Sequence, residues 1–448
     1  MHFAFVADYL PSPNTSGAGL HLWSMVKCLA DRGHRLTYIV VGKPHELYLL
    51  DGPELEHLWQ SLAELGVRVE HKELPTVSIR VSGNQPGQSG LELVRRMVRQ
   101  FRGLPQAFVP QFEHYDRMYH VADIQARITD MIQALAVDAI FAFNFGAIGA
   151  LRGIRSVPRV ALPGDPVDQL LWTHLKYNRD ANWRGRLSLL LQVAMFRRFP
   201  QWLLHNLAGF ESVTWTAAHH VEWLRAQGVK QCRYIPTPVP DMVGPDCEAK
   251  RSAIPKNKKP KLLHVGHLGG TAAMTGLYLF LEDTLPILEQ QLGEDGFEVH
   301  FIGRQDMGPS IVRLLNRPNV RLRGFIEDLT YEFLSSDIFV VPIPHRVGMR
   351  TRLVTGLSYG CCVVAHENCR LGNPELVHEK NVLLANDGKG LAACILRALR
   401  DDNLRKRLRR NARRTYEQHF SLESAGAQYA DELERVAREF KGFAGLRT

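Results

Sequence analysis

Two arginines stand at the entrance of a predicted helix in the carboxyl-terminal half of the chain. Gly348 precedes Arg350 and Arg352, and the predicted helix runs to Gly360. Cations are disfavoured at the positive end of a helix dipole, so this pair makes sense if an anion lies beside it. A diphosphate would neutralise both charges, because each guanidinium offers paired donors to phosphate oxygens. The alternative is that both side chains point into solvent and bind nothing.

Small residues form the turn between the first predicted strand and the first predicted helix. The strand ends at Ala7, the turn spans 16–19, and apolar residues at helical spacing begin at Leu22. Gly17 and Gly19 leave backbone N–H groups free at a helix N-terminus, which suits a phosphate or a sugar oxygen. The same residues are also typical of an ordinary tight turn between a strand and a helix.

The segment 372–375 is a third turn that follows a predicted strand. Pro374 suits the first position of a helix, and Glu375 falls in the first turn, where a carboxylate is stabilised. A capping role explains this carboxylate without a ligand. Its place after another parallel strand nonetheless directs it to the same edge as the arginines.

Short β-branched runs alternate with longer amphipathic stretches, which is typical of βα units built on parallel sheets. The strand candidates are 3–7, 36–41, 139–143, 159–162 and 213–216, and then 261–265, 299–302, 320–323, 338–341, 362–365 and 382–384. The chain has 448 residues, more than the roughly 300 that one core supports. We therefore expect an α/β protein of two facing, doubly wound, Rossmann-like domains with ligands bound in the cleft between them. The expected domains are 1–240 and 261–420, and the Pro- and Lys-rich segment 241–260 is the expected linker.

Composition narrows the class of partner. The 55 Lys and Arg outnumber the 46 Asp and Glu, which favours anionic partners such as nucleotides, phospholipid head groups or nucleic acid. A nucleic-acid binder is disfavoured, because aromatic residues do not interleave with the basic runs. The seven cysteines lack metal-ligand spacing, and no apolar run is long enough to span a membrane. We expect a cytoplasmic protein with free thiols and without a signal peptide.

A basic amphipathic helix is predicted over 91–104. Its apolar residues are Val94, Met97, Val98 and Phe101, and its basic residues are Arg95, Arg96, Arg99 and Arg102. Such a helix can lie on an anionic membrane, which would place the protein at the inner face. The alternative is a basic face in solvent whose other side packs on the sheet.

Several motifs together resemble the retaining, nucleotide-sugar-dependent glycosyltransferases of the GT-B fold, close to the large family four, the glycosyl transferases group 1. The motifs are SGAG, LLHVGHLGG, FIGR, VRLRGFIEDLTYEFLSSDIFVVPI, GMRTRLVTGLSYGCCVVAH and GNPELVHEKNVLL. The resemblance is strongest over 261–420. It implies that 421–448 forms closing helices that cross back to the first domain. The segment 72–135 matches nothing in the family, which fits an acceptor-specific region.

The resemblance also implies roles for single residues. Arg350 and Arg352 would be the catalytic cations on the diphosphate. The implied donor-binding residues are Gly17, Gly19, Gly266, His267, Arg304, Gly348, Thr355 and Glu375.

Two departures from the family pattern concern donor binding. His267 stands where many members have an arginine. Val347 and Thr355 occupy the places of two glutamates that contact the sugar and the ribose. A threonine hydroxyl still accepts one hydrogen bond, at a cost of about 1 kcal/mol relative to a charged acceptor.

The chemistry implied by the resemblance is transfer of a sugar from a nucleoside diphosphate to a glycan, glycolipid or small acceptor, in polysaccharide or glycoconjugate biosynthesis. Preorganised cations and helix N-termini would stabilise the charge that grows on the leaving diphosphate. We expect no cofactor and no catalytic metal, because the sequence has no Asp-x-Asp motif or histidine cluster at a strand end. A non-catalytic relative that binds a sugar nucleotide or a glycan is the alternative, supported by Thr355 and His267.

Overall fold

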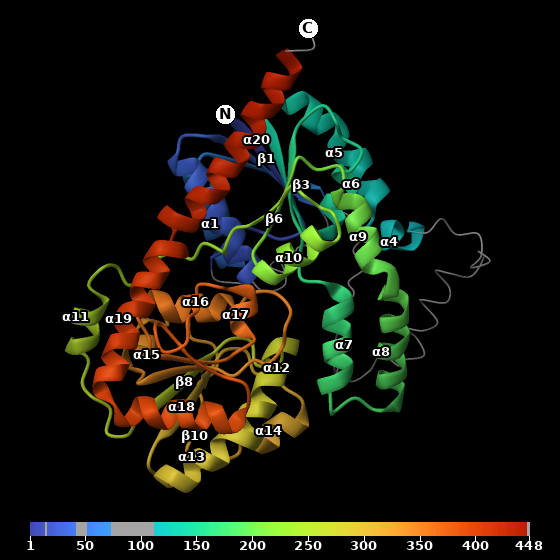
Figure 1. Cartoon of the computed structure of the whole chain (residues 1–448). Coiled ribbons are helices and arrows are strands. Elements are labelled where there is room, and N and C mark those ends of the chain that lie inside the picture. Colours follow the sequence, from blue (N-terminus) through green and yellow to red (C-terminus); the bar gives the residue numbers. More distant parts are fainter. Residues whose placement is uncertain (14–15, 42–51, 73–111, 446–448) are drawn as a thin grey trace.

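The computed structural model describes residues 1–13, 16–41, 52–72 and 112–445 (Figure 1). Two parallel sheets organise this part of the chain, with strand orders β3-β2-β1-β4-β5-β6-β7 and β10-β9-β8-β11-β12-β13. The strands of the first sheet are β1 (His2–Ala7), β2 (Arg35–Val41), β3 (Val67–Lys72), β4 (Ala139–Phe143), β5 (Arg159–Leu162), β6 (Ser212–Trp215) and β7 (Cys232–Tyr234). Those of the second are β8 (Lys261–Val265), β9 (Glu298–Ile302), β10 (Val320–Leu322), β11 (Ile338–Val341), β12 (Val363–His366) and β13 (Leu383–Ala385).

Every strand predicted from sequence is present, to within one residue at most ends, and the predicted α/β architecture is confirmed. The central strands are fully buried apolar runs, as expected for parallel strands covered on both faces. Strands β3 and β7 were not predicted from the sequence. Both lie at the outer edges of the first sheet. Edge strands bury less apolar surface, so they give a weaker hydrophobic pattern.

Helices cover both faces of each sheet (Figure 1). In the first domain they are α1 (Gly17–Asp31), α2 (Gly52–Glu64), α4 (Glu113–Met118), α5 (Val121–Leu135), α6 (Asn144–Leu151), α7 (Val167–Tyr177), α8 (Trp183–Met195), η2 (Phe196–Arg198), α9 (Phe199–Leu207) and α10 (Ala218–Ala226). In the second domain and beyond they are α11 (Cys247–Ala253), α12 (Thr271–Tyr278), η3 (Leu279–Thr284), α13 (Leu285–Leu292), α14 (Pro309–Leu315), α15 (Thr330–Ser335), α16 (Thr351–Ser358), α17 (Cys369–Gly372), α18 (Gly388–Arg400), α19 (Asp402–His419), η4 (Leu422–Gly426) and α20 (Ala427–Gly445). None of the helices in these ranges is long and apolar enough to cross a membrane. The basic helix expected over 91–104 lies outside the described residues.

The segment expected to be a linker contains a docked helix. Arg251 of α11 is buried and donates hydrogen bonds to the carbonyls of Leu334, Ser336 and Tyr359 in the second domain. Cys247 of the same helix is also buried. This segment is therefore packed on the second domain rather than suspended between the two.

The end of the chain returns to the first domain. From α19, which lies on the second domain, the chain continues through η4 into α20 beside α1 (Figure 1). Tyr429 of α20 is buried and donates a hydrogen bond of 2.9 Å to the carbonyl of Ile235, and Ser212 donates one of 2.5 Å to Glu432. The segment α19–η4–α20 thereby connects the two domains, because α19 packs on the second domain and α20 packs on the first.

Candidate donor-binding site at the domain junction

The carboxyl edges of the two sheets face each other, and two helix N-termini meet there. Gly17 opens α1, and a Cβ atom placed on it would lie 3.0 Å from Oγ1 of Thr351, the first residue of α16. Ser16 caps α1 by accepting a hydrogen bond of 2.9 Å from the N–H of Gly19. Neither helix has an acidic residue in its first turn. Two positive helix ends therefore converge without a carboxylate of their own to offset them.

Arg352, in the first turn of α16, adds a full charge to this region. A Cβ atom on Gly266 would lie 2.5 Å from its Cζ, and Gly266 has a φ of 138°, so a residue without a side chain is required beneath the guanidinium. Nη1 of Arg352 lies 3.4 Å from Nε2 of His264, whose Nδ1 is 2.9 Å from the carbonyl of Val340. The imidazole therefore donates through Nδ1 and faces the arginine with its free lone pair.

The charge of Arg352 has no counter-ion within the described residues. No carboxylate lies within 4.0 Å of its guanidinium nitrogens. Enclosure by the protein, and secondarily the neighbouring Arg350, lower the pKa of Arg352 to about 10. It is still a cation at neutral pH, and an enclosed cation without a partner is costly. A bound anion would remove that cost.

Arg350 is placed differently from the sequence-based expectation that both guanidiniums face a diphosphate. Its side chain is buried and folds back onto its own loop, where it donates to the carbonyls of His345 and Val347. The segment before α16 is thus held in shape by Arg350, whereas Arg352 is the cation left free for a ligand. The spacing of residues in the sequence cannot show that an arginine side chain folds back to bind the carbonyls of its own loop.

Asp165, in the loop after β5, is a junction residue that the sequence analysis missed. A Cβ atom on Gly348, which has a φ of 70°, would overlap its carboxylate, so the two domains touch here. Asp165 is exposed and forms no hydrogen bond or ion pair with any other residue described. Although solvent reaches the edge of the residue, protein atoms surround this carboxyl and raise its pKa by desolvation, and the positive charge of Arg350 opposes that rise. In the sequence PGDP the residue is indistinguishable from an ordinary turn aspartate.

Neutral histidines bridge the same junction. Nε2 of His220 accepts a hydrogen bond of 3.0 Å from the N–H of Gly348, and Nδ1 of His345 lies 2.9 Å from Oγ1 of Thr173. Burial, together with nearby positive charge, lowers the pKa of His220 and of His345 to about 3. Both are therefore uncharged near neutral pH, so the loop before α16 is held to the first domain by neutral hydrogen bonds.

The other predicted donor-binding residues are partly committed to protein partners. His267 pairs with Asp306, and the hydroxyl of Thr355 donates to the carbonyl of Thr351 at 3.2 Å. Glu375 accepts a hydrogen bond of 3.0 Å from Tyr234 of the first domain. Arg304 has an exposed side chain. The structure thus brings Gly17, Gly19, Gly266, Gly348 and Arg352 to the carboxyl edges of the sheets, and gives Glu375 an interdomain contact.

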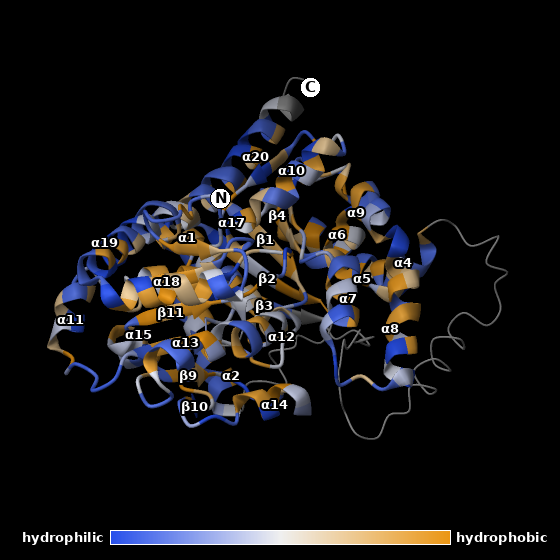
Figure 2. Ribbon diagram, turned by 60° about the horizontal axis from the view of Figure 1, so that its bottom comes forward, coloured by the Kyte–Doolittle hydropathy of each residue, from blue (hydrophilic) through white to orange (hydrophobic). Residues whose placement is uncertain are grey.

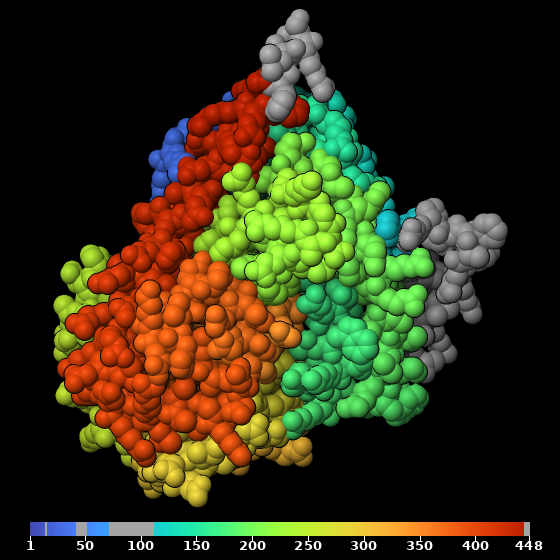
Figure 3. All heavy atoms as spheres, viewed as in Figure 1, coloured from blue at the N-terminus to red at the C-terminus, as the bar shows by residue number. Residues whose placement is uncertain are grey.

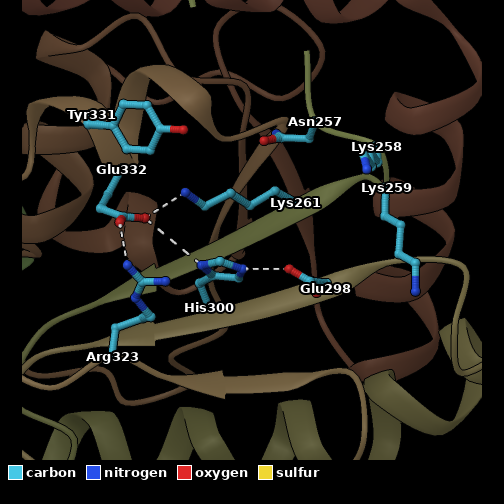
Figure 4. Close-up of a pocket in the computed structure, with 9 residues that line it drawn as sticks. All are labelled: Asn257, Lys258, Lys259, Lys261, Glu298, His300, Arg323, Tyr331 and Glu332. Atoms are coloured by element: carbon cyan, nitrogen blue, oxygen red, sulfur yellow. Dashed lines mark hydrogen bonds and ion pairs between the residues drawn. The ribbon is translucent and has the colours of Figure 1, made fainter. Parts of the chain in front are cut away.

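A separate cavity of about 330 Å³ lies beside the amino ends of β8 and β9 and contains none of these residues (Figure 4). Lys261 forms a buried ion pair of 2.5 Å with Glu332, and His300 lies 3.0 Å from Glu298. Both carboxylates of the lining, Glu298 and Glu332, are thus paired with neighbouring basic side chains. Across the described ranges, no cluster of three or more His, Cys, Asp or Glu residues could hold a metal ion.

Residues 259–401 match the family described as Glycosyl transferases group 1. With two facing Rossmann-like domains and a helix that crosses back, the chain is a glycosyltransferase of the GT-B fold.

Solved structures share this fold along nearly the whole chain. A glycosyltransferase from Rickettsia africae is 12% identical with a TM-score of 0.60, over 97% of this chain and 98% of that one. HepE from Anabaena, solved with UDP and glucose, is 15% identical with a TM-score of 0.59, over 96% and 99% of the two chains. A variant of TarM from S. aureus, in complex with Fondaparinux, alpha-GlcNAc-glycerol and UDP, is 10% identical with a TM-score of 0.62, over 96% and 99%. No curated protein matches this chain by sequence.

Proposed function

We propose that this glycosyltransferase moves a hexose-type sugar from a nucleoside diphosphate sugar to a hydroxyl group of a glycan, glycolipid or small-molecule acceptor, with retention at the anomeric carbon and without a metal ion. The observation that carries the proposal is the unpaired cation of Arg352 between two helix N-termini that lack acidic residues in their first turns. An anion with the size and charge of a diphosphate is the chemical complement of that arrangement. The UDP bound in the structures of HepE and TarM supports it.

In the proposed reaction the bond from the anomeric carbon to the diphosphate oxygen breaks, and the electron pair leaves with the diphosphate. Arg352 and the N–H groups at the start of α1 and α16 stabilise that growing negative charge, which is where such enzymes gain most of their rate. The acceptor hydroxyl attacks the same face of the sugar, and its proton passes to the departing phosphate oxygen. The protein then needs no nucleophile of its own.

Two further residues fit supporting roles. Asp165 offers an unengaged carboxylate beside Gly348, so it can accept hydrogen bonds from hydroxyl groups of the substrate. Arg350 holds the loop on which Gly348 lies and is a positioning residue. The donor-side residues come from both domains, so the site is complete only when the domains are together.

Turnover of a panel of nucleoside diphosphate sugars, read by release of the diphosphate, tests the proposal. Replacement Arg352→Ala should lower turnover by about 100-fold or more, because it removes a charged donor from the leaving group. Arg370→Ala, which alters an exposed arginine paired with Glu367, is the matched control. Near-normal turnover of Arg352→Ala would remove this cation from the mechanism, and proton NMR of the product anomer decides retention.

The alternative is a relative that binds a sugar nucleotide or a glycan without turnover, and one observation supports it. The hydroxyl of Thr355 donates a hydrogen bond to the carbonyl of Thr351 in the same helix, and the side chain has no negative charge to accept hydrogen bonds from a ribose. Thermal stabilisation by a nucleotide sugar without diphosphate release under any acceptor would favour this alternative.

A further inference from the structure

Helix α8 carries an unusual exposed face. The side chains of Trp183, Leu187, Leu190 and Leu191 are 68%, 48%, 50% and 41% exposed, although large apolar residues are normally buried. They follow the i, i+4, i+7, i+8 spacing of one side of a helix. The opposite side packs into the protein through Ser188, Leu189 and Gln192. The exposed apolar stripe is therefore a surface in its own right and not a frayed part of the core.

Arginines border this stripe on both sides. Arg184 and Arg186 lie in the first turns of α8, and Arg197 and Arg198 lie in η2, directly after it; all four are exposed. No Asp or Glu occurs anywhere between residues 181 and 210. Figure 2 shows hydrophobic and hydrophilic residues side by side along α8, at the rim of the molecule.

The neighbouring helix α7 also has exposed aromatic and basic side chains. Trp172 of α7 is 58% exposed, and Lys176 of α7 is exposed as well. In Figure 3 the α7–α8 hairpin forms the lower right lobe of the molecule, beside the second domain. The surface has two exposed tryptophans, three exposed leucines and five exposed cations, and the one acidic residue of its two helices, Asp168 of α7, is only partly exposed. This composition is typical of segments that lie at a lipid–water interface.

We propose that the exposed face of α8, with Trp172 of α7, is a docking surface for a bilayer that contains anionic phospholipid. The apolar stripe enters the acyl boundary, and the arginines beside it reach back to the phosphate groups. Charge complementarity singles out a lipid surface, because an apolar protein partner would not require four cations with no acid among them. This surface is distinct from the segment 91–104, and the proposal does not depend on the proposed reaction.

The position of α8 gives the contact a consequence for the acceptor. Helix α7 packs against α8 on one side, and its Thr173 contacts His345 at the domain junction. Helix α7 therefore lies between α8 and the junction, and a bilayer on the outer face of α8 would lie about two helix diameters, about 20 Å, from the junction. An acceptor held in the membrane would need to extend about that far to reach the site.

Co-sedimentation of the full chain with vesicles tests the proposal. Wild type should bind vesicles of phosphatidylcholine mixed with phosphatidylglycerol and should bind pure phosphatidylcholine weakly. The variant Leu187→Gln/Leu190→Gln/Leu191→Gln should lose at least about tenfold in partitioning, since each leucine contributes apolar transfer energy. The variant Arg184→Gln/Arg186→Gln should lose about tenfold or more, from roughly 1 kcal/mol per charge near the surface.

A matched control is provided by α19, a second basic helix whose exposed residues include no large apolar side chain. Arg407→Gln/Arg410→Gln removes the same charge from an exposed helical face and should leave vesicle binding within about twofold of wild type. An equal loss in this control would show attraction by net charge alone and overturn the proposal.

Tryptophan fluorescence locates the contact directly. Brominated phospholipids should quench wild type, and Trp183→Phe should lose much of that quenching, whereas Trp223→Phe on α10 should not. Vesicle binding with quenching unchanged in Trp183→Phe would place the contact elsewhere on the chain. A stable dimer in light scattering that the leucine variant dissociates would assign the face to a second copy instead.

Discussion

At the scale of single residues, the electrostatics of the site depend on which charges lack partners. Arg352 and Asp165 approach the junction from opposite domains, and neither pairs with a described residue of opposite charge. Arg350 lies near both of these residues, and its guanidinium donates hydrogen bonds to backbone carbonyls. The protein therefore keeps one cation and one carboxylate available for ligand and uses the second arginine to shape the loop.

Replacement Asp165→Asn separates sugar recognition from diphosphate binding. We expect kcat/KM for transfer to fall by about tenfold to a hundredfold, because a charged acceptor of a substrate hydroxyl is lost. Affinity for a nucleoside diphosphate without sugar should be unchanged or higher, since a negative charge near the phosphates is removed. Calorimetric titration with nucleoside diphosphate and with the sugar nucleotide measures the two effects. Equal affinities and unchanged turnover would show that Asp165 does not face substrate.

The same substitution has a consequence for stability. The folded-state pKa of Asp165 is raised, so ionisation at neutral pH costs the folded protein free energy that the unfolded chain does not pay. Asparagine removes the charge, and the ligand-free variant should melt at a higher temperature than wild type at neutral pH. Below the ordinary pKa of aspartate the difference should shrink, because both proteins are then uncharged at this position.

At the scale of elements, the sequence pattern could predict the strands because the central strands are mostly apolar and buried. Strand β3 has the alternating sequence VRVEHK and β7 has only three residues, so neither gives a strong pattern. The helix within the segment 241–260 was missed for another reason. Its packing on the second domain depends on Arg251, which is buried and binds backbone carbonyls. In the sequence, an arginine in a Pro- and Lys-rich segment is indistinguishable from an exposed charge of a linker.

The exposed apolar stripe of α8 could not be predicted from the sequence either. Leucines in WRGRLSLLLQVAM suggest a buried helix until the structure shows which side packs. The candidate site could be predicted at the level of its loops, because Gly17, Gly348 and Arg352 follow strands in both halves of the chain. The orientation of a guanidinium and the approach of Asp165 across domains depend on tertiary contacts, which no spacing encodes.

Arg251 provides the stability test at this scale. The variant Arg251→Ala should lose about 3 kcal/mol of unfolding free energy, because several buried carbonyls of the second domain are left without a donor. Urea unfolding followed by circular dichroism measures the loss. Glu248→Ala, an exposed substitution on the same helix, is the control and should change stability by no more than about 0.5 kcal/mol. Equal effects of the two substitutions would mean that α11 is not anchored by its arginine.

At the scale of the whole molecule, the two domains are joined by the segment α19–η4–α20 and by interdomain hydrogen bonds of neutral histidines. Burial lowers the pKa values of His220, His264 and His345 to about 3, and the positive charge of Arg350 or Arg352 adds to the effect. A folded-state pKa below the ordinary 6.5 means that the unfolded chain binds protons first as pH falls. Stability is therefore fully present above about pH 6.5 and declines below it, by up to about 1.4 kcal/mol per pH unit for each such histidine.

A bound nucleoside diphosphate should oppose this acid transition. The anion offsets the positive charge that disfavours the protonated histidines and holds the domains together, so the midpoint of acid unfolding should move to lower pH when UDP, GDP or ADP is present at saturation. Intrinsic fluorescence across a pH series, with and without each nucleotide, measures the shift. Arg352→Ala should lose most of the nucleotide-dependent shift and keep the underlying decline, because the histidines are still buried. A shift of equal size in Arg352→Ala would show that the nucleotide binds away from the domain junction.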